Sequence, residues 1–571
     1  MKNLQKIILK NNDNIIKTIY WNKFFDKKNK DISIVNYIEN NDVYLREKLT
    51  SILDNITENN LKYFDEFKIE KDFSFWLLSN FEEKNLYKKN KFYELTKVIA
   101  LIEIVKNLKF NDAHVYIDDK IYKETIKNIL NSKKIQKNTN FKNFKKNFLY
   151  EFISLFKAII FLFRKLFHSR KKIFFNKEYN LFISFFSYVK EEDFKKGNYI
   201  SLFWGNLKKI VNMNILNLYI KNNIDNNFSR LNHKLHNLSN KNEIYNFLDS
   251  FLDLKVIWKI LIISFKIKIR FHKNLNNFKV LYNNIDISPI MLFDLGKNFL
   301  FFNIVIKLYY FYLFDIFFKK NNFNQNCFYI HENQPWEKSL IYHWKRNNKG
   351  KIFGVINSSV RFWDIRYKKT KYNPDILLAN GQDSFDKLLK FGYKNSDIKK
   401  VEALRYDRDL YFEKSKLEGK NEILILYDYS KKSNEFLTNI LNKSQLIKNY
   451  KIYIKKHPLS NYKIEKSNFK FHENDEGHCK KIFDLVICTN KTTASVDYYI
   501  DGQKIAILIE PNSFNFSPLK GNMHCEFFHD NIELDQILKN TSNSIKKNNI
   551  NSNFFLINSE LNEWKKIFNN E

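Results

Sequence analysis

The sequence contains little glycine, proline or cysteine. Only 11 Gly and 6 Pro occur among 571 residues, which excludes a collagen-like chain and argues against a low-complexity disordered one. The four cysteines have neither the spacing of a disulfide framework nor that of a metal site. We therefore interpret Cys327, Cys479, Cys488 and Cys525 as reduced thiols of a cytoplasmic protein.

Several common motifs are also missing. There is no Gly-x-x-x-x-Gly-Lys-Ser/Thr loop for ATP and no Gly-x-Gly-x-x-Gly loop for a dinucleotide, which excludes kinases and dehydrogenases. No zinc-finger, RNA-binding or basic-zipper module is present, so nucleic acid is not an expected partner. Residues 1–10 lack the apolar stretch of a secretory signal, and no export is expected.

Core-forming and basic side chains are abundant. Hydrophobic residues make up 44% of the chain, with 56 Phe, and a chain of this length is expected to form two packed domains. Lys and Arg outnumber Asp and Glu by 96 to 62, a formal net charge of +34. Such a charge attracts a protein to polyanions, and we expect an anionic membrane surface as the partner.

Two segments are apolar enough to raise the question of a membrane. Charged residues interrupt 148–167, whereas a spanning helix needs about 20 mostly uncharged residues. Lys and Arg flank this segment on both sides, so it is either an amphipathic helix in a lipid interface or a helix buried against the protein. The second segment, 299–318, contains Asn303, Lys307 and Asp315 and is expected to be a core helix.

The order of predicted elements indicates an α/β fold. Residues 35–110 are expected to be helical, with one helix opening at Asp72, and 114–119 to include a short strand. A basic helical insertion follows at about 140–175. Strand-like runs then alternate with helix-length segments, at 180–187, 213–219, 280–283, 327–331 and 351–355. This alternation predicts a mainly parallel sheet.

A second sheet is predicted from about residue 421. Strands are expected at 422–427, 450–454, 469–472, 485–488 and 504–509, with helices at 435–446 and 494–500. We therefore predict two Rossmann-like domains, 1–414 and 415–571, with a cleft between them. The first has a helical N-terminal region and the basic amphipathic insertion, and a last helix near 561–568 is expected to pack back onto it.

Candidate ligand-binding residues are those that follow the strands, because open α/β sheets bind ligands at the carboxyl ends of their strands. Lys456, His457 and Pro458 follow the strand at 450–454, and Pro458 ends that strand because it lacks an N–H. Ammonium and imidazole groups at this edge can meet a phosphate. The alternative is a surface turn with solvated lysines.

Hydroxyl side chains follow the next strand of the same sheet. Thr489, Thr492, Thr493 and Ser495 precede or open a helix, where hydroxyls and unpaired N–H groups form an anion site. Ordinary helix capping is the alternative, although capping needs only one hydroxyl. Glu510 follows the strand at 504–509 and is expected to accept a ribose hydroxyl, or else to lie in a solvated turn.

The first sheet carries acidic residues at the corresponding edge. Glu332 and Glu337 follow the strand at 327–331, and either is a candidate general base for an acceptor hydroxyl. The alternative is that one of them only caps the helix or pairs with Lys338. We expect the carboxylate of Glu332 to face His457 across the cleft.

Two arginines are candidate clamps for an anion. Arg361 and Arg366 follow the strand at 351–355, and a guanidinium can hold a carboxylate or a phosphate with two parallel hydrogen bonds. Asp407 and Asp409 have the spacing of metal ligands, but they lie in a predicted linker. We therefore expect neither a metal nor a cofactor.

Five blocks carry a family resemblance. They are WLLS at 76–79 with EEKN at 82–85, YISLFWGNL at 199–207, ENQPWE at 332–337, SSVRFWDIRY at 358–367 and EALRY at 402–406. Together they resemble a family of bacterial surface-carbohydrate, or O-antigen, biosynthesis proteins. The resemblance covers most of the chain and is weakest at 140–180 and 220–320. It implies a pathway, polysaccharide biosynthesis, more firmly than a reaction.

The second domain separately looks like the nucleotide-binding half of GT-B glycosyltransferases. Its Lys456-His457-Pro458 and the later hydroxyl cluster are similar to the His-Pro and paired-serine motifs with which bacterial sialyltransferases, polysialyltransferases and Kdo transferases hold CMP. Thr492-Thr493 and Ser495 stand where those enzymes commonly have adjacent serines, and the sialyltransferase type of acidic motif is missing. The resemblance implies a nucleotide-sugar donor and leaves CMP, UDP and other nucleotides open.

Taken together, the resemblances imply a GT-B-like, metal-independent glycosyltransferase. Its first domain would bind a lipid-linked or oligosaccharide acceptor, and its second the nucleotide sugar. The product would be a surface polysaccharide, made on the inner face of the cytoplasmic membrane. Two alternatives remain: a sugar-nucleotide epimerase with the same double Rossmann frame, and a non-catalytic scaffold of a polysaccharide assembly complex.

Overall fold

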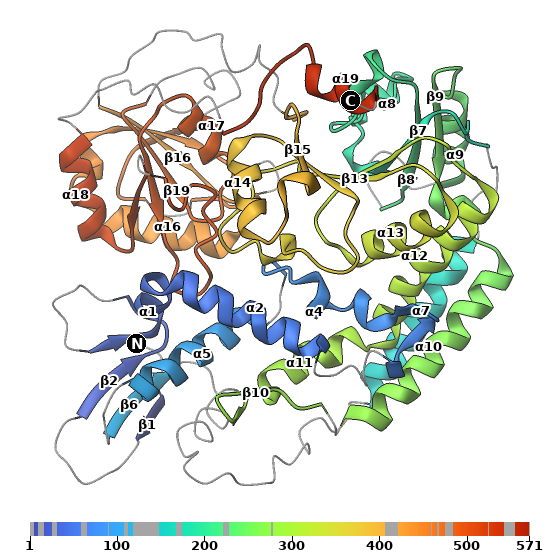
Figure 1. Cartoon of the computed structure of the whole chain (residues 1–571). Coiled ribbons are helices and arrows are strands. Elements are labelled where there is room, and N and C mark those ends of the chain that lie inside the picture. Colours follow the sequence, from blue (N-terminus) through green and yellow to red (C-terminus); the bar gives the residue numbers. More distant parts are fainter. Residues whose placement is uncertain are drawn as a thin grey trace.

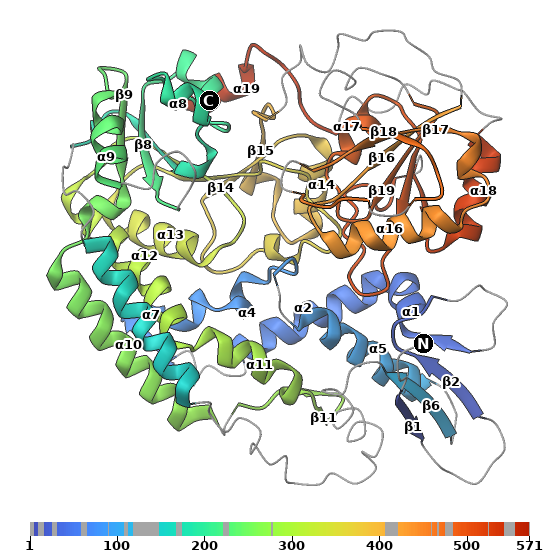
Figure 2. The ribbon, with the colours of Figure 1, turned by 180° about the vertical axis from the view of Figure 1, so that it is seen from behind.

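Two parallel β-sheets form the framework of the protein, with helices packed on both (Figures 1 and 2). This computed structural model describes residues 5–8, 16–24, 31–58, 65–88, 91–107, 112–117, 148–166, 174–220, 228–275, 278–405, 421–457, 460–464, 467–473, 483–522, 525–541 and 554–569. The predicted class, α/β with two Rossmann-like domains in a GT-B-like arrangement, is confirmed.

The first sheet has seven strands in the order β15-β14-β13-β12-β7-β8-β9, all parallel. Their bounds are β7 Asn180–Phe185, β8 Met213–Leu218, β9 Glu243–Phe247, β12 Cys327–Ile330, β13 Ile352–Val355, β14 Ile376–Ala379 and β15 Ile398–Lys400. The chain adds β8 and β9 on one side of β7 and then returns to the other side with β12. The strand order therefore reverses between β7 and β12.

The second sheet has six parallel strands in the order β18-β17-β16-β19-β20-β21. Their bounds are β16 Glu422–Leu426, β17 Lys451–Lys455, β18 Phe471–Glu473, β19 Leu485–Thr489, β20 Ile505–Leu508 and β21 Cys525–Phe528, and the helices are α16 Lys431–Lys443, α17 Ser495–Ile500 and α18 Asn531–Thr541. Here the order reverses between β16 and β19. Every residue of β16 and β19 is buried, as expected for central parallel strands covered on both faces.

The N-terminal region is a smaller unit with its own sheet, in the order β1-β6-β2-β3. Its elements are β1 Gln5–Ile8, β2 Ile16–Tyr20, β3 Ile32–Ser33, β6 Asp112–Ile117, α1 Ile34–Asn40, α2 Asp42–Glu58 and α5 Phe92–Asn107. The helix predicted to open at Asp72 is wrong. Residues 68–74 form the hairpin of β4 Lys68–Glu70 and β5 Phe73–Ser74, and Ser74 caps only a short 3-10 turn because its side chain accepts the Trp76 N–H.

A layer of helices packs below the seven-stranded sheet in the view of Figure 1. It contains α7 Phe148–Leu166, α10 Leu254–Asn274, α11 Ser288–Asn298, α12 Phe301–Lys320 and α13 Pro335–Asn347. Among the described residues one helix, α12, is long and apolar enough to cross a membrane, and it is mostly buried. The prediction of a core helix there is confirmed, since α12 packs against α7, α10 and α13.

One predicted strand of the first sheet lies elsewhere. Within 280–283, only β10 Leu281–Tyr282 is a strand, and it pairs with β11 Ile285–Asp286 in an isolated antiparallel hairpin. Asn283 and Asn284 between them have φ of 47° and 63°. Asparagine tolerates this left-handed region, so the pair makes a tight two-residue turn that returns the chain before it can join a parallel sheet.

The last helix, α19 Asn562–Phe568, packs back onto the seven-stranded sheet as expected. The ring of Trp564 is completely buried against Phe328 of β12, and its indole N–H donates to the carbonyl of Glu402 at 2.9 Å. The N-terminal unit contacts the six-stranded half instead: the Tyr93 hydroxyl donates to the carbonyl of Pro511 at 3.1 Å. These contacts fix the two halves relative to each other.

Candidate functional site

Two adjacent cavities lie between the two sheets. One cavity, of about 440 Å³, lies on the six-stranded side and another, of about 720 Å³, on the seven-stranded side. Four residues line both cavities: Tyr87, Arg361, Arg405 and Thr493. We call the first the basic cavity, because Arg361, Arg405, Lys455, Lys456, His457 and Lys491 line it, and the second the histidine cavity, because it contains His331.

Each cavity lies where the strand order of its sheet reverses. The basic cavity is lined by 426–429 after β16 and by 491–494 after β19, the two strands that flank the reversal. The histidine cavity is lined by Tyr188, which follows β7, and by His331 and Glu332, which follow β12. Loops diverge at such a point and leave a crevice, which is where open α/β sheets bind ligands.

His457 enters the basic cavity from the end of β17. Its backbone N–H donates to the carbonyl of Tyr427 at 3.1 Å, which holds this end of the strand against β16. The imidazole is exposed and lines the cavity together with Lys456. The third member of the predicted motif, Pro458, lies outside the described residues.

The four predicted hydroxyls divide into two pairs. Thr492 and Thr493 line the basic cavity with His457. Thr489 and Ser495 do not: both are buried, the hydroxyl of Thr489 lies 3.1 Å from that of Thr492, and the hydroxyl of Ser495 donates to the carbonyl of Thr492 at 2.9 Å. The prediction that Ser495 reaches the pocket is wrong, because its hydroxyl is used to hold the loop before α17.

Glu510 is committed to an ion pair. Its carboxylate lies 3.1 Å from the ammonium of Lys491, and it is absent from the residues that line either cavity. The expected contact with a ribose hydroxyl therefore has no geometric support. Lys491, which the sequence analysis passed over, takes its place in the basic cavity, where Glu510 and the hydroxyl of Ser433 position its ammonium.

Arg361 joins the two cavities. It follows β13 in the first half, yet its guanidinium donates to the carbonyl of Lys491 at 3.3 Å and to the hydroxyl of Thr493 at 3.4 Å in the second half. The same guanidinium lies 5.2 Å from the ring centre of Tyr87, a contact of the cation–π type. Burial raises the pKa of Tyr87 well above its usual range, so its hydroxyl stays protonated.

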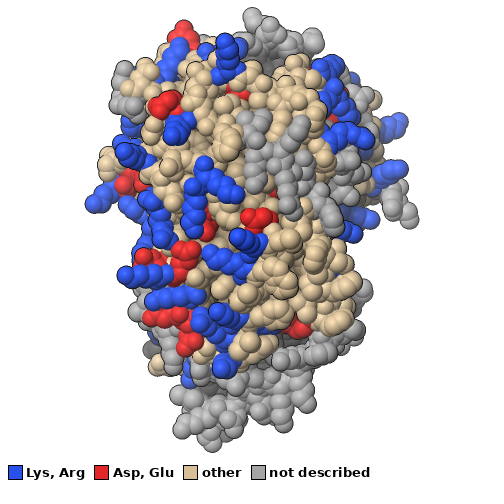
Figure 3. All heavy atoms as spheres, turned by 90° about the vertical axis from the view of Figure 1, so that its right-hand side faces the viewer, with Lys and Arg blue, Asp and Glu red and all other residues tan. Residues whose placement is uncertain are grey.

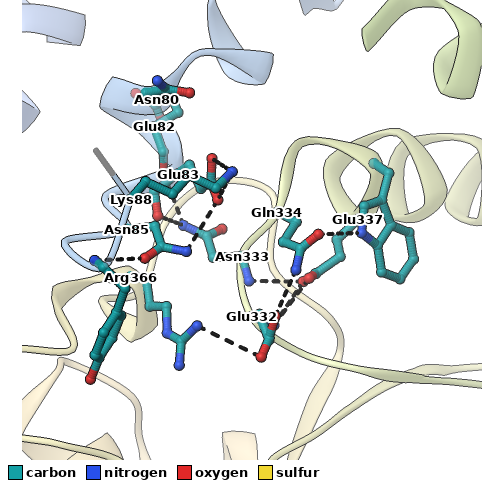
Figure 4. Close-up of polar contacts among 12 residues, drawn as sticks. Asn80, Glu82, Glu83, Asn85, Lys88, Glu332, Asn333, Gln334, Glu337 and Arg366 are labelled. Carbon is teal, nitrogen blue, oxygen red and sulfur yellow. Dashed lines mark hydrogen bonds and ion pairs between the residues drawn. The ribbon is translucent and has the colours of Figure 1, made fainter. Parts of the chain in front are cut away.

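Glu332 lines the histidine cavity from the loop after β12 (Figure 4). Its carboxylate accepts the amide N–H of Gln334 at 2.6 Å and lies 3.8 Å from the guanidinium of Arg366. Arg366 also lines this cavity, and its Nε lies 3.2 Å from the carboxylate of Asp364. Both predicted residues thus face the cleft, and each has a partner of opposite charge or polarity.

Glu337 does not reach the cleft. Its side chain is completely buried and accepts the backbone N–H of Glu332 at 3.0 Å and that of Asn333 at 2.9 Å (Figure 4). The other neighbour of this carboxylate is Nδ1 of His331, at 3.1 Å. Burial raises the pKa of Glu337. The prediction of Glu337 as a base that touches the acceptor is wrong. Its side chain, in the first turn of α13, points to the backbone of the loop after β12 and not to the cleft.

Asn333 ties this loop to the N-terminal region. Its φ is 58°, in the left-handed region, and its side-chain amide donates to the carbonyls of Glu82 and Glu83 at 2.9 and 3.2 Å. Figure 4 shows this contact between α4, Asn80–Glu83, and the loop after β12. The same N-terminal segment continues to Tyr87, so one docking contact positions residues of both cavities.

His331 is the group that the sequence analysis missed on this side. Its ring is 2% exposed, lines the histidine cavity, and has Nδ1 2.9 Å from the hydroxyl of Tyr329 and 3.1 Å from Glu337. Gly354 allows the neighbouring strand to approach, because a Cβ there would lie 3.0 Å from that of His331. A buried carboxylate at Nδ1 holds an imidazole in the orientation and tautomer that leaves Nε2 able to accept a proton.

The described residues contain no group of three or more His, Cys, Asp or Glu side chains placed to hold a metal ion. Asp407 and Asp409, the pair with metal-ligand spacing, lie outside these residues. Of the side chains that line the basic cavity, six are basic or imidazole, against Asp428 and Asp497 as the carboxylates. The cavity is therefore suited to an anion rather than to a cation.

No protein-family model matches the sequence, and no curated protein matches it. Among solved structures it is similar to a UDP-N-acetylglucosamine 2-epimerase from Rickettsia bellii (TM-score 0.35, 12% identity, 69% of this chain and 96% of that one). It is also similar to a lipopolysaccharide outer core galactosyltransferase (0.31, 10%, 68% and 95%) and to a calicheamicin glycosyltransferase (0.33, 5%, 65% and 91%).

Proposed function

We propose that this protein is a glycosyltransferase that moves a sugar from a nucleotide-activated donor, a CMP- or NDP-sugar, to a growing surface polysaccharide. The observation that carries the proposal is the pair of adjacent cavities. They place a cavity suited to phosphate on one sheet beside a cavity that contains proton acceptors on the other. Group transfer between two bound substrates needs sites that open onto each other.

The basic cavity is the site that we assign to the donor. Its volume of about 440 Å³ is within the usual range for small-molecule pockets. Lys456, His457 and Arg361 would neutralise the phosphate, and the hydroxyls of Thr492 and Thr493 would donate hydrogen bonds to it. In this proposal these side chains, without a metal, stabilise the charge that develops on the leaving nucleotide.

The histidine cavity is the site that we assign to the acceptor. His331 would take the proton of the acceptor hydroxyl through Nε2 while the acceptor oxygen bonds to the anomeric carbon of the sugar. The bond from that carbon to the phosphate oxygen breaks, and its electron pair leaves with the nucleotide. Glu337 would stabilise the imidazolium through Nδ1, as the carboxylate of a Ser-His-Asp catalytic triad does for its histidine.

Glu332 is the second group that could accept this proton, and it is the one that the sequence predicts. Its carboxylate is held in place by the amide of Gln334 and the guanidinium of Arg366, an arrangement that suits a hydrogen-bond acceptor. We therefore assign Glu332 to holding the acceptor by hydrogen bonds. The acceptor itself we propose to be lipid-linked, at the inner face of the cytoplasmic membrane.

A thermal-shift screen of CMP, CDP, UDP and GDP tests the donor site. Selective stabilisation by one nucleotide is expected, because a ligand that binds only the native state raises its stability. The shift should be lost in His457→Ala and kept in His472→Ala, an exposed histidine on β18 of the same sheet that lines neither cavity. No shift with any nucleotide would contradict the donor site and favour a scaffold.

Turnover distinguishes the remaining alternative. With the nucleotide sugar that corresponds to the stabilising nucleotide, a transferase should release nucleotide faster when acceptor is added. Conversion of the nucleotide sugar into its epimer without acceptor would instead identify an epimerase.

A further inference from the structure

Helix α10 presents a continuous apolar stripe to solvent. Leu254, Trp258, Ile262, Phe265 and Ile269 recur every three or four residues and so share one side of the helix. Their side chains are between 48% and 64% exposed. The core is contacted by a different side of the helix, through Val256, Ile257, Ile260, Ser264, Ile267 and Phe271. The helix is therefore apolar on two sides, and only one of them is used for packing.

Basic residues lie directly beside this stripe. At about 100° per residue, the exposed Lys255, Lys259, Lys266, Arg270 and Lys273 are about 100–160° from Leu254, next to the apolar side chains. No Asp or Glu occurs between Leu254 and Asn274. Lys255, Lys266 and Lys273 form no ion pair with a described acidic residue. Their charges are available to an external anionic surface.

Helix α7 repeats the pattern beside α10. Phe152, Phe156 and Phe163 are 59%, 59% and 45% exposed and share one side of the helix, with the exposed Lys157 and Arg164 next to them. Its other side, with Ala158 and Leu162, is buried in the core. Helix α7 is thus buried against the protein on one side, and on another side it leaves apolar residues exposed.

The two helices form one surface, which we call the α7–α10 face. Both pack on α12, and the ammonium of Lys268 on α10 lies 2.6 Å from the carboxylate of Glu151 on α7. Figures 1 and 2 both show them side by side along one edge of the molecule. Figure 3 faces this edge, where an uncharged area lies beside a column of Lys and Arg side chains with some Asp and Glu among them.

The charges on this face favour an anionic lipid bilayer over a second copy of the chain as its binding partner. A second copy of the chain would bring two sets of Lys and Arg together with no acidic side chains on α10 to compensate them, so like charges would repel. An anionic lipid bilayer offers a charged headgroup layer for the basic residues and an apolar layer for the aromatic stripe directly beneath it. Tryptophan and lysine are also residues that prefer this boundary.

We propose that the α7–α10 face is a membrane-docking surface, on which both helices lie in the headgroup region of an anionic bilayer. This proposal extends the proposed function, because it assigns a location to the membrane association. It depends on that function only for the purpose that docking would serve. α12 lies between the face and α13, the helix that follows the loop of Glu332. Docking would therefore hold the seven-stranded half, with the histidine cavity, next to the lipid surface.

Trp258 allows a direct test with the full-length chain. The other tryptophans are all buried, so a change in emission upon binding reports mainly on Trp258. Vesicles of phosphatidylcholine with about 30% phosphatidylglycerol should shift the emission to shorter wavelength and carry the protein in co-sedimentation. Raising the salt from about 0.1 to 0.5 M should weaken the binding at least about tenfold, because screening removes the attraction of the basic residues.

Two variants separate the contributions. Phe152→Ser with Phe265→Ser should reduce partition into these vesicles at least about tenfold, and Lys255→Glu with Lys266→Glu should do the same only for vesicles that contain phosphatidylglycerol. Ile532→Ser removes an apolar side chain that is 63% exposed on α18, and is the matched control that should bind like the parent. All these residues are exposed, so the variants should keep the parent's thermal unfolding.

Absence of vesicle binding, or binding that neither variant weakens, would overturn the docking surface. So would a dimer that the serine variant dissociates without any vesicle binding, since the occupant would then be a second copy. Nucleotide thermal shifts in the same preparations keep the two proposals apart. A chain that binds its nucleotide but no vesicle refutes the docking surface alone, and one that binds vesicles but no nucleotide refutes the donor site alone.

Discussion

The two sheets offer the same backbone geometry to the cleft but different chemistry. Both have a reversal of strand order, at β16/β19 in one and at β7/β12 in the other, and a cavity lies at each. The six-stranded side supplies exposed or half-buried basic groups such as His457 and Lys456. The seven-stranded side supplies a buried imidazole backed by a buried carboxylate. The fold determines where ligands bind, and the residues after each strand determine what they are.

The two sides also differ in how their side chains are held. Exposed cations can shift by small distances and still neutralise a phosphate, because the Coulomb interaction falls off slowly. A proton acceptor must be within hydrogen-bond distance of one hydroxyl, and His331 is fixed by Tyr329, Glu337 and the close approach of Gly354. Substitutions on the two sides should therefore have different consequences.

The largest effect is expected for His331→Gln. It removes the proposed proton acceptor and should lower kcat by about 10² to 10⁴-fold, the usual contribution of a general base, with little change in the thermal shift given by the nucleotide. Single-turnover kinetics and the thermal shift measure the two quantities. Glu332→Gln is the control, with an expected loss of about tenfold. If Glu332→Gln loses more activity than His331→Gln, the two roles are reversed.

Acid should destabilise the seven-stranded half through a second histidine, His343 on α13. Burial lowers its pKa to about 3, while the unfolded chain takes up a proton near 6.5. Between these two pKa values the native state binds fewer protons than the unfolded chain. The contribution of neutral His343 to stability is therefore complete above pH 6.5 and is lost as the pH falls. Between pH 7 and 4.5 the loss is about 2 to 3 kcal/mol.

The variant His343→Phe keeps a ring beside Phe311 and cannot take up the proton. Its free energy of unfolding, measured with urea, should therefore fall less on acidification than that of the parent. The described histidines of the six-stranded half, His457, His472 and His529, are all at least partly exposed. His472→Phe should therefore leave the acid sensitivity unchanged. If both variants reduce the acid sensitivity of unfolding equally, the two halves do not differ in their histidine-linked stability.

A smaller effect is expected on the donor side. Lys456→Ala with His457→Ala removes two of the six cationic or imidazole groups of the basic cavity and should weaken nucleotide binding about 10 to 100-fold, with kcat at saturating donor largely kept. Titration calorimetry gives the affinity. Lys431→Ala, an exposed lysine on α16 outside the cavity, controls for net charge. A fall in kcat alone would contradict the division between the two sides.

The smallest effect is expected for Ser495→Ala. The hydroxyl of Ser495 is buried and donates to the carbonyl of Thr492, away from the cavity. Nucleotide affinity should change by less than about threefold, and the free energy of unfolding should fall by about 1 kcal/mol for the lost hydrogen bond. Thr493→Ala, on the wall shared by both cavities, should weaken the affinity more. The reverse order would show that the loop rearranges when the nucleotide binds.

Much of the fold could be predicted from the sequence, because central parallel strands are buried on both faces and so form continuous apolar runs. The runs at 180–187 and 485–488 became β7 and β19. The short strands β14, β15 and β21, which lie at or next to the edges of their sheets, were missed, since strands of three or four residues carry little local signal. The strand expected at 280–283 became a hairpin because two asparagines adopt left-handed conformations there.

By itself the sequence determined which polar side chains follow the strands: His457 and Thr492 after β17 and β19, and Glu332 after β12. Only the tertiary structure decided which of these side chains share a cavity. Tyr87 and Arg361 are separated from their partners by more than a hundred residues, and Glu337 contacts His331 instead of facing the cleft. Local sequence favours a strand or marks the start of a helix, whereas contacts across the cleft depend on strand order and on the packing of distant segments.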